Sequence, residues 1–169
     1  MPESPQVFRV ALVILSDRAA SGRRPDASLP IMRECLPREC TVVTERILAD
    51  DRDELESLLK HLADVDRVDG VLTSGGTGLS PRDCTPQATL AVADYEVPGI
   101  AEAMRVRSAQ AVPTAILSRA VAVVRNRTLI INLPGNPKAV RETLGIIAPV
   151  LRHAFEVLRG SVSDHAISG

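Results

Sequence analysis

The first half of the chain alternates between strand-like apolar runs and helix-like periodicity. Val7 to Leu15 is almost continuously apolar, and shorter apolar runs follow at Thr41 to Leu48 and Val68 to Thr73. Such runs predict strands that are covered on both faces of a sheet. Between the second and third runs, apolar residues recur at the spacing of one helix face, at Leu55, Leu58, Leu59, Leu62 and Ala63. This alternation predicts parallel strands joined by crossover helices.

The second half of the chain predicts a change in sheet topology. Ala120 to Val124 and Thr128 to Ile131 are apolar runs separated by only three residues. Because so short a connection leaves no room for a crossover helix, the two runs predict an antiparallel hairpin. Further helices are expected from Pro86 to Ala93, from Gly99 to about Ala109, and in two segments between Pro137 and Gly160.

Composition supports one compact domain. The 169 residues are 45% hydrophobic and 24% charged, which is enough apolar sequence for a substantial core. The expected fold is a three-layer α/β/α domain over residues 1–160, with a mostly parallel sheet and the late antiparallel hairpin. A mobile tail is expected at 161–169.

The charge, the aromatic content and the cysteines of the chain indicate which binding partners and which cellular compartment to expect. The net charge is −1 and only 2% of the residues are aromatic, so no nucleic-acid partner is expected. Neither a signal peptide nor an apolar run of membrane-spanning length is found, so no membrane association is expected. Cys35, Cys40 and Cys84 are odd in number and lack metal-ligand spacing, which fits a reduced, cytoplasmic protein.

The stretch from Val71 to Pro86 carries the clearest sign of chemistry, because an apolar strand runs into a glycine-rich turn. Three glycines among residues 75–78 allow positive φ angles and let successive backbone N–H groups point at one anion. Thr85 is expected to cap the following helix, with Pro86 at its first position. The positive end of that helix would then face the same region. A simple strand-to-helix connection is the alternative, since the stretch matches neither the Walker nor the dinucleotide-binding pattern.

Three other polar loops are expected near the carboxyl ends of the strands, where ligands collect in such sheets. They are Ser16 to Asp26, the pair Asp50-Asp51, and Asn132 to Asn136. In the last, Gly135 permits close approach and Asn136 can cap a helix that begins at Pro137. A plain helix start is the alternative for this segment.

Two aspartates have competing interpretations. Asp51 and Glu54 resemble a capping box, which would leave Asp50 free to face the sheet edge. The alternative is that Asp50 itself favours the helix dipole. Asp83 lies beside the anion-binding turn, where a carboxylate must bind a metal, take a proton or hold a substrate donor. Its alternative is a salt bridge to an arginine.

Taken together, these motifs resemble the MogA type of molybdopterin adenylyltransferase. The segments that carry the resemblance, in order, are Ser16 to Gly22, Thr73 to Gly78 with Arg82 to Pro86, Val97 to Gly99, Leu117 to Arg119, and Ile131 to Lys138. The likeness extends from about Val7 to Gly160. It departs from the family at Gln87, where an acidic residue is common, and at Ser28, where glycine is frequent.

The resemblance implies a function. Proteins of this family are α/β domains that assemble as trimers and use Mg²⁺ to transfer AMP from ATP to the terminal phosphate of molybdopterin, releasing pyrophosphate. Their product passes to a molybdate-inserting enzyme. The catalytic positions of the family match Asp50 and Asp83. The ligand-contacting positions implied here are Asp17, Thr73, Gly75, Gly76, Thr77, Gly78, Ser118, Arg119, Asn132, Pro134, Gly135 and Asn136.

The chemistry of this reaction favours different roles for the two aspartates. Asp50 is assigned to Mg²⁺ and Asp83 to the N–H groups of the pterin, with the opposite division as the alternative. Arg82 or Arg119 would screen the developing charge. Other readings are a MoaB-type relative, the similar domain of a longer molybdate-inserting enzyme, and a non-enzymatic trimeric module that only binds molybdopterin. Release of pyrophosphate from ATP distinguishes an enzyme from the last of these.

Overall fold

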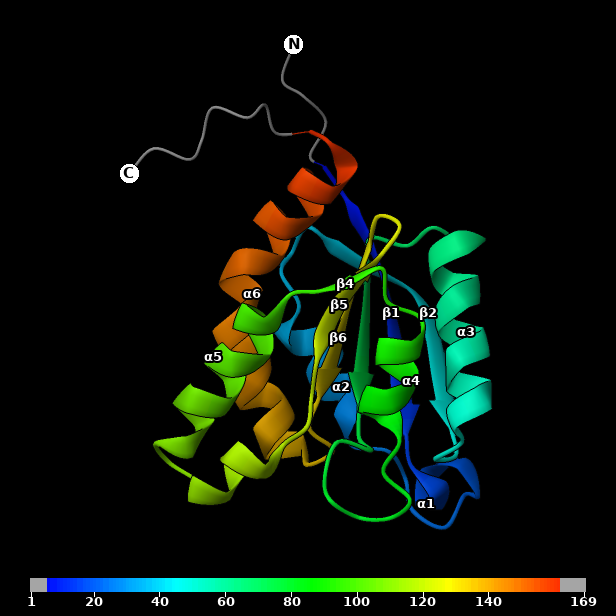
Figure 1. The fold of residues 1–169 in the computed structure, drawn as a ribbon, viewed down its shortest axis with the longest axis vertical. Helices are drawn as coiled ribbons and strands as arrows, with labels where there is room; N and C mark the ends of the chain where they lie inside the picture. Colours follow the sequence, from blue (N-terminus) through cyan, green and yellow to red (C-terminus); the bar gives the residue numbers. More distant parts are fainter. Residues whose placement is uncertain (1–5, 162–169) are drawn as a thin grey trace.

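A six-stranded mixed sheet forms the centre of the computed structural model, which describes residues 6–161. The strand order is β2-β1-β3-β6-β5-β4. Strands β2, β1, β3 and β6 are parallel, whereas β5 is antiparallel to β6 and β4 is antiparallel to β5 (Figure 1). The predicted parallel sheet and late hairpin are therefore confirmed. The strands are β1 (Phe8–Leu15), β2 (Cys40–Leu48), β3 (Gly70–Ser74), β4 (Tyr95–Glu96), β5 (Ala122–Arg125) and β6 (Thr128–Leu133).

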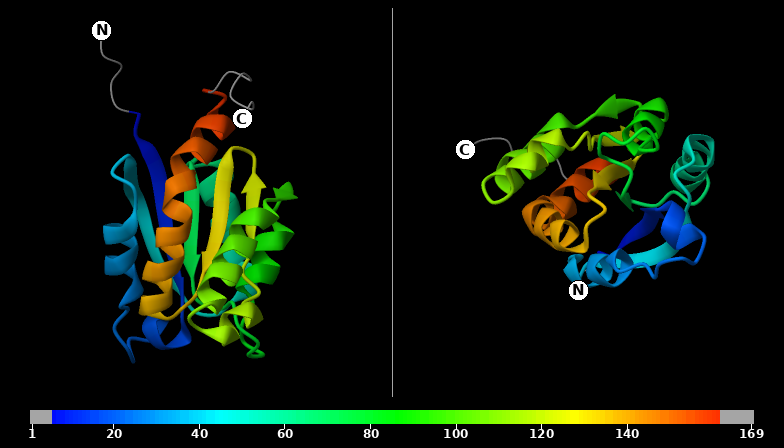
Figure 2. Two further views of the ribbon diagram at one scale, coloured as in Figure 1. Left: turned by 90° about the vertical axis from the view of Figure 1, so that its left-hand side faces the viewer. Right: turned by 90° about the horizontal axis from the view of Figure 1, so that it is seen from below.

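Helices cover both faces of the sheet (Figure 2). The helices α2, α5 and α6 pack on one face and α3 and α4 on the other, each group with its own apolar cluster. The described chain thus has the three layers that the sequence predicts. No helix between residues 6 and 161 is long and apolar enough to cross a membrane. The helices are α1 (Asp17–Ala20), α2 (Ser28–Cys35), α3 (Arg52–Asp64), α4 (Thr85–Ala91), α5 (Pro98–Ala109), the 3-10 helix η1 (Pro113–Leu117) and α6 (Pro137–Arg159).

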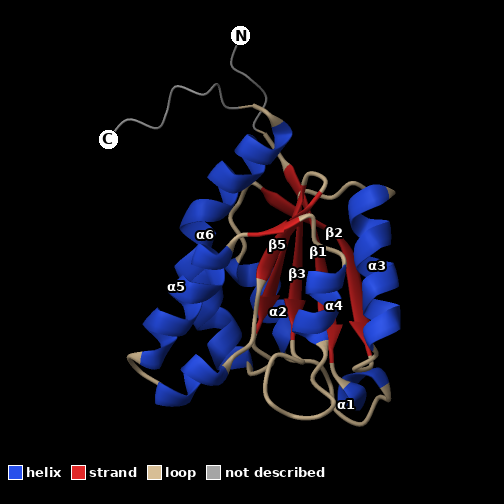
Figure 3. Cartoon of the chain, viewed as in Figure 1, coloured by secondary structure: helices blue, strands red, loops and turns tan. Residues whose placement is uncertain are grey.

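The pleat of β1 explains its continuous apolar sequence. Val10, Leu12 and Ile14 belong to the cluster under α2 and α6, while Ala11 and Val13 belong to the cluster under α3. Successive side chains of a strand point to opposite faces, so a strand with a helix layer on each side needs apolar residues at every position. The same geometry aligns the carboxyl ends of the four parallel strands at one edge, where the loops and α1 gather (Figures 1 and 3).

Helix α6 corrects one prediction. Two helical segments were expected after Pro137, but the structure has one helix that continues through Gly145 and Pro149. Proline lacks an N–H and its ring crowds the carbonyl four residues earlier, which here belongs to Gly145. The buried face of α6 continues on both sides of that point, through Val140, Thr143, Leu144, Ile147, Leu151 and Phe155, so packing against the sheet outweighs the local signal.

Three short elements were not predicted. These are α1, the two-residue strand β4 and η1, and each is too short to show a periodic pattern. The mobile tail expected at 161–169 lies outside the described residues, apart from Ser161.

Candidate functional site

A cleft of about 660 Å³ opens at the carboxyl ends of the parallel strands. Its walls come from the segments that follow β1, β2, β3 and β6, as the loop positions predicted. Five of the predicted site residues line this cleft together with Arg82: Asp17, Asp50, Gly75, Gly76 and Asp83. Two more predicted site residues, Gly135 and Asn136, also line it. Segments far apart in sequence therefore meet at one site.

The glycine turn is held in a conformation that only glycine accepts readily. Gly75 and Gly76 have φ angles of 100° and 68°. A Cβ atom on Gly75 would collide with the carbonyl oxygen of Leu15, and one on Gly76 would collide with Oγ1 of Thr85. Within residues 6–161, the backbone N–H groups of Gly76, Thr77 and Gly78 donate to no protein acceptor. The turn thus presents adjacent free donors, which suit an anion.

Thr85 anchors the turn instead of capping the helix, which corrects a second prediction. The cap position of α4 is Cys84, whose side chain makes no capping hydrogen bond, and Thr85 already belongs to the helix. The buried hydroxyl of Thr85 donates to the carbonyl of Gly75 at 2.9 Å. Its backbone N–H donates to the carbonyl of Gly76 at 3.2 Å. These two hydrogen bonds to consecutive glycines hold the turn against the start of α4.

Asp50 follows β2 and its side chain lines the cleft. The next residue, Asp51, accepts the backbone N–H of Glu54 at 2.9 Å and caps α3, as predicted. The backbone N–H of Asp50 donates to Oδ1 of Asp17 at 2.9 Å, and Oδ2 of Asp50 accepts the N–H of Asp17 at 3.4 Å. The other oxygen, Oδ1, is buried and accepts no hydrogen bond from the described chain. Asp50 therefore does not cap α3.

These surroundings raise the pKa of Asp50. Burial is the main cause, because desolvation penalises the charged carboxylate, and the negative charges of Asp17 and Asp83 add repulsion. The hydrogen bond from the backbone of Asp17 and the positive charge of Arg82 oppose this shift without cancelling it. A buried carboxylate oxygen without a partner is costly and uncommon, so it marks a functional position.

Asp17 and Arg82 tie the loop after β1 to the loop after β3. The Arg82 guanidinium donates to both carboxylate oxygens of Asp17, at 2.8 and 3.0 Å. These hydrogen bonds hold the pKa of Asp17 below its usual value. Both side chains are exposed at the rim of the cleft. Arg82 therefore has its positive charge beside the anion-binding turn.

Asp83 packs over the glycine turn. Its Oδ2 accepts the backbone N–H of Ser80 at 3.3 Å and lies 2.8 Å from the point where a Cβ on Gly78 would be. Within the described part of the chain, Asp83 forms no ion pair, so the alternative of a salt bridge is not realised there. Its carboxylate remains available as an acceptor in the cleft.

Arg119 braces the same turn from behind. Its Nε donates to the carbonyl of Gly78 at 2.8 Å and its Nη2 to the carbonyl of Asp83 at 2.9 Å. Its backbone N–H donates to the carbonyl of Thr77 at 2.9 Å. The guanidinium thus spans the loop between Gly78 and Asp83, which gives it a positioning role.

Thr73 and Asn132 lie in the interior and do not line the cleft. Both side chains are fully buried, and Nδ2 of Asn132 donates to the hydroxyls of Thr73 at 3.0 Å and of Thr89 at 2.9 Å. Oδ1 of Asn132 accepts the backbone N–H of Val121 at 3.2 Å. The two residues join β3, β6 and α4 beneath the site. The sequence does not reveal Thr89 as their partner, because a lone threonine in a helix has no distinctive signal.

A second cavity of about 440 Å³ adjoins the glycine turn on the other side. It contains four more of the predicted contact residues: Thr77, Gly78, Ser118 and Pro134. Most of its remaining walls are apolar and come from α5, η1 and α6, including Met104 and Leu117. The predicted contacts are thus divided between a polar cleft and an apolar cavity that share the glycine turn.

The segment after β6 lines the cleft next to the glycine turn, and it lies at the carboxyl ends of the strands, as predicted. A Cβ on Gly135 would lie 3.3 Å from Cα of Gly75, so two strand ends approach closely here. Oδ1 of Asn136 accepts the backbone N–H groups of Lys138 at 2.9 Å and Ala139 at 3.3 Å and caps α6. Two further residues that line the cleft, Arg18 and Arg24, were not singled out in the sequence, although their loop was.

Comparison with known proteins identifies the family of this chain. Residues 11–153 match the family described as "Probable molybdopterin binding domain". This chain belongs to that family. It is 49% identical over 140 residues to a molybdopterin adenylyltransferase of Escherichia coli, which covers 81% of this chain and 72% of the relative. It is also 40% identical over 159 residues to the enzyme of that name from Helicobacter pylori, covering 92% of this chain and 90% of the relative.

A solved structure has the same fold as this chain. The molybdopterin biosynthesis enzyme MoaB from Thermus thermophilus superimposes with a TM-score of 0.87 at 44% sequence identity. The match covers 91% of this chain and 98% of that protein. The fold expected from the motifs is therefore that of the MogA and MoaB proteins.

Proposed function

We propose that this chain is a molybdopterin adenylyltransferase, which transfers AMP from ATP to the terminal phosphate of molybdopterin and releases pyrophosphate. Relatives that carry this name are 49% and 40% identical to it. One observation of the site carries the proposal. The unpartnered oxygen of Asp50 would lie 3.2 Å from a Cβ on Gly76, so this carboxylate adjoins the first residues of the glycine turn in one cleft.

The residues of the cleft suit the meeting of two polyanions. A phosphate that approaches the α-phosphorus of ATP must be positioned while its charge is neutralised. The N–H groups of Gly76 and Thr77 donate to no acceptor of the described chain, so they are available to phosphate oxygens. Arg82 supplies a positive charge at the rim, where an incoming phosphate competes with Asp17 for its guanidinium. The apolar cavity beyond the turn suits a planar heterocycle of one of the substrates.

Mg²⁺ fits the groups that are present. The ion takes oxygen ligands and is commonly bound by one or two carboxylates together with substrate phosphates. Oδ1 of Asp50 is a buried carboxylate oxygen without a hydrogen-bond partner in the described chain, and Asp17 lies beside it. This mode needs no cage of three protein ligands, and none is formed among residues 6–161. When bound, the ion would neutralise phosphate charge, and Asp50 is the residue that we assign to it.

We further propose that the protein works as a trimer in the cytoplasm and passes its product to a molybdate-inserting enzyme. The trimer rests on the family resemblance and on exposed apolar side chains near the second cavity, at Leu79, Val106 and Ile116. The proposed cytoplasmic location is supported by three free cysteines, Cys35, Cys40 and Cys84.

The decisive experiment mixes the purified protein with ATP, Mg²⁺ and molybdopterin. We expect release of pyrophosphate and formation of adenylylated molybdopterin in equal amounts, both dependent on molybdopterin. Binding of molybdopterin without any release of pyrophosphate would instead favour a non-enzymatic binding module.

A further inference from the structure

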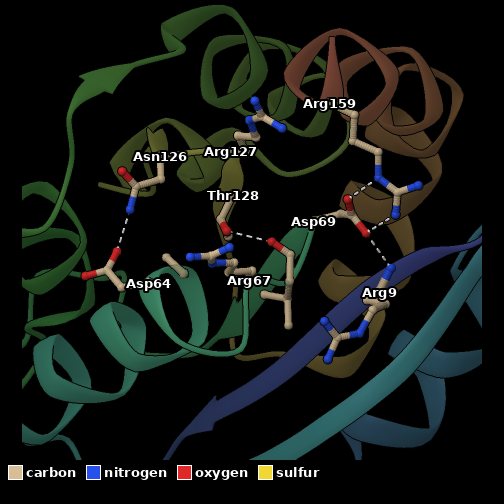
Figure 4. A pocket seen from close by; sticks show the side chains of 10 residues that line it. Arg9, Asp64, Arg67, Asp69, Asn126, Arg127, Thr128 and Arg159 are labelled. Carbon is tan, nitrogen blue, oxygen red and sulfur yellow. Dashed lines mark hydrogen bonds and ion pairs between the residues drawn. The ribbon is translucent and has the colours of Figure 1, made fainter. Parts of the chain in front are cut away.

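A separate cavity of about 610 Å³ lies at the other end of the sheet. It is formed by the carboxyl end of α3, the start of β6 and the end of α6, together with Arg9 of β1. None of the residues that line it belongs to the catalytic cleft or to the apolar cavity. Figure 4 shows its polar side chains, which come from segments distant in sequence. The proposed transfer reaction gives this cavity no role.

Positive charge predominates in this cavity, although the whole chain has a net charge of −1. Both of its aspartates are already neutralised. Asp69 accepts two hydrogen bonds from Arg159, each at 2.6 Å, and Asp64 pairs with Arg125 at 2.6 and 2.9 Å. The charged residues of the lining are two aspartates, Asp64 and Asp69, and four arginines, Arg9, Arg67, Arg127 and Arg159.

Three of these arginines retain donors for a ligand. Among the described residues, the guanidinium groups of Arg67 and Arg127 donate to no protein acceptor, and Arg9 donates only from Nη1, to the carbonyl of Asp66 at 2.7 Å. Each guanidinium carries five N–H donors in a planar fork that matches phosphate. The carboxylate of Asp66 lies 3.4 Å from His61, and Asp66 is not among the residues that line the cavity.

The neighbouring helix ends do not use these donors. The carbonyl of His61 near the end of α3 accepts the N–H groups of Val65 and Asp66, and that of Leu62 accepts Val68. The end of α6 is closed in the same way by Gly160 and Ser161. The chain therefore satisfies these carbonyls itself, and capping of helix ends does not explain Arg67 or Arg127.

The backbone of the cavity is unusual at two points. In residues 6–161, Arg67 and Asn126 are the non-glycine residues with positive φ, at 51° and 54°, and both line this cavity. A left-handed conformation is disfavoured for a residue with a side chain, more so for arginine than for asparagine. Such conformations concentrate at ligand-binding sites.

We propose that this cavity binds a small oligophosphate anion, either free pyrophosphate or the phosphates of a nucleotide, through Arg9, Arg67 and Arg127. The cavity volume of about 610 Å³ and the guanidinium groups of three separate arginines favour a compact ligand with several phosphate oxygens. The cavity shares no lining residue with the catalytic cleft, so this proposal can be tested separately from the proposed reaction.

Amide chemical shifts measured by NMR test this proposal, because they report on the two ends of the sheet separately. Titration with inorganic pyrophosphate should shift the amides of Asn126 and Thr128 saturably. In the double variant Arg67→Gly with Arg127→Ser, that affinity should fall about tenfold or more, while the response of Gly76 in the cleft should not change. Glycine adopts positive φ without strain, so Arg67→Gly preserves the backbone.

A matched control removes an exposed arginine elsewhere. Arg46→Gln on β2 changes the net charge by one unit and should leave the affinity at Asn126 and Thr128 unchanged. A parallel titration with ADP distinguishes the sources: tighter binding of ADP assigns the site to a nucleotide, and equal or weaker binding assigns it to free pyrophosphate. The proposal is overturned if Asn126 and Thr128 show no saturable shift, if the double variant binds as tightly as the wild type, or if Arg46→Gln weakens binding equally.

Discussion

Asp50 is arranged for chemistry at the expense of stability. One of its oxygens is buried without a partner in the described chain, and burial and neighbouring carboxylates raise its pKa. An interior carboxylate that served only the fold would be fully hydrogen-bonded. We therefore propose that its free oxygen binds Mg²⁺, which would neutralise the charge of the transferring phosphate.

Replacement of this carboxylate should reduce turnover. We expect Asp50→Asn to lower kcat about a hundredfold, or roughly 2.7 kcal/mol of transition-state stabilisation, with little change in molybdopterin affinity. Pyrophosphate release and calorimetric titration measure the two quantities. Asp53→Asn, an exposed carboxylate on the first turn of α3, is the control and should keep full activity. Loss of affinity with normal turnover would show that Asp50 binds the pterin.

The same substitution should stabilise the fold at neutral pH. Because the pKa of Asp50 is higher in the folded than in the unfolded protein, its ionisation favours unfolding. Below the pKa of the unfolded state both forms are protonated and no penalty exists, while above the folded-state pKa the penalty is complete. In Mg²⁺-free buffer, Tm of Asp50→Asn should exceed that of the wild type at pH 7, and the difference should shrink as the pH falls through the folded-state pKa. A difference that grows towards acid pH would contradict the assignment.

Asp83 should affect binding more than turnover. Its carboxylate is an acceptor beside the glycine turn with one hydrogen bond, from Ser80. In Asp83→Asn an amide donor would face the N–H groups of the pterin, so we expect molybdopterin affinity to fall about tenfold or more. Calorimetric titration tests this directly. Normal affinity together with greatly reduced turnover in Asp83→Asn would show that Asp83 and Asp50 have the opposite roles.

At the scale of whole elements, the glycine turn is a loop held from several sides. Thr85 binds its first carbonyls and Arg119 spans the carbonyls of Gly78 and Asp83. A loop braced in this way keeps its free N–H groups oriented before the substrate arrives. We therefore expect anion binding to depend on the conformation of this turn more than on any single side chain.

Loss of this brace should weaken the site without removing any substrate contact. Arg119→Lys keeps the positive charge, but a single ammonium group cannot replace two guanidinium nitrogens that reach two carbonyls. We expect kcat/KM to fall about tenfold, mainly through KM, with a broadened response of the Gly78 amide in NMR spectra. An unchanged amide signal together with lost activity would indicate direct action on the substrate.

The elements also show what the sequence can and cannot predict. The cap of α3 by Asp51 is confirmed. It could be predicted because the donor and the acceptor are only three residues apart in the sequence. The cap assigned to Thr85 is wrong, because its hydroxyl bonds instead to Gly75, which is near only in the fold. The break expected within α6 is wrong as well, since packing of residues on both sides of Pro149 outweighs it.

For site residues the same distinction holds. The order of the predicted strands indicates that the ends of β1, β2, β3 and β6 meet, so the loop from Ser16 to Asp26, Asp50 and the glycine turn were found. Asp17 itself was implied by the family resemblance. It does not indicate which way a side chain points at a strand end. Thr73 and Asn132 face the interior and bond to each other, which requires knowledge of the neighbouring strand and helix.

Across the whole molecule, the two ends of the sheet are built differently. The glycine turn and Asp50, which has an oxygen without a partner in the described chain, lie at the carboxyl ends of the parallel strands. The pair of Asp69 and Arg159 lies at the amino ends, beside the arginine-lined cavity. Arg159 also lies over the ring of Phe8, 4.6 Å from its centre. This pair joins the end of α6 to the sheet, so the fold is secured at the end away from catalysis.

At the scale of the whole molecule, we predict that three copies of this chain assemble as a trimer. Leu79, Val106 and Ile116 are 64–66% exposed although apolar, and contact between protomers would remove them from water. Light scattering over a concentration series should give three times the 18.1 kDa mass of one chain. Ile116→Asp should shift the protein towards the monomer, because burial of a carboxylate opposes association. Val65→Asp, equally exposed at 65% after α3, should leave the mass unchanged; a wild-type protein that is monomeric at every concentration would refute the trimer.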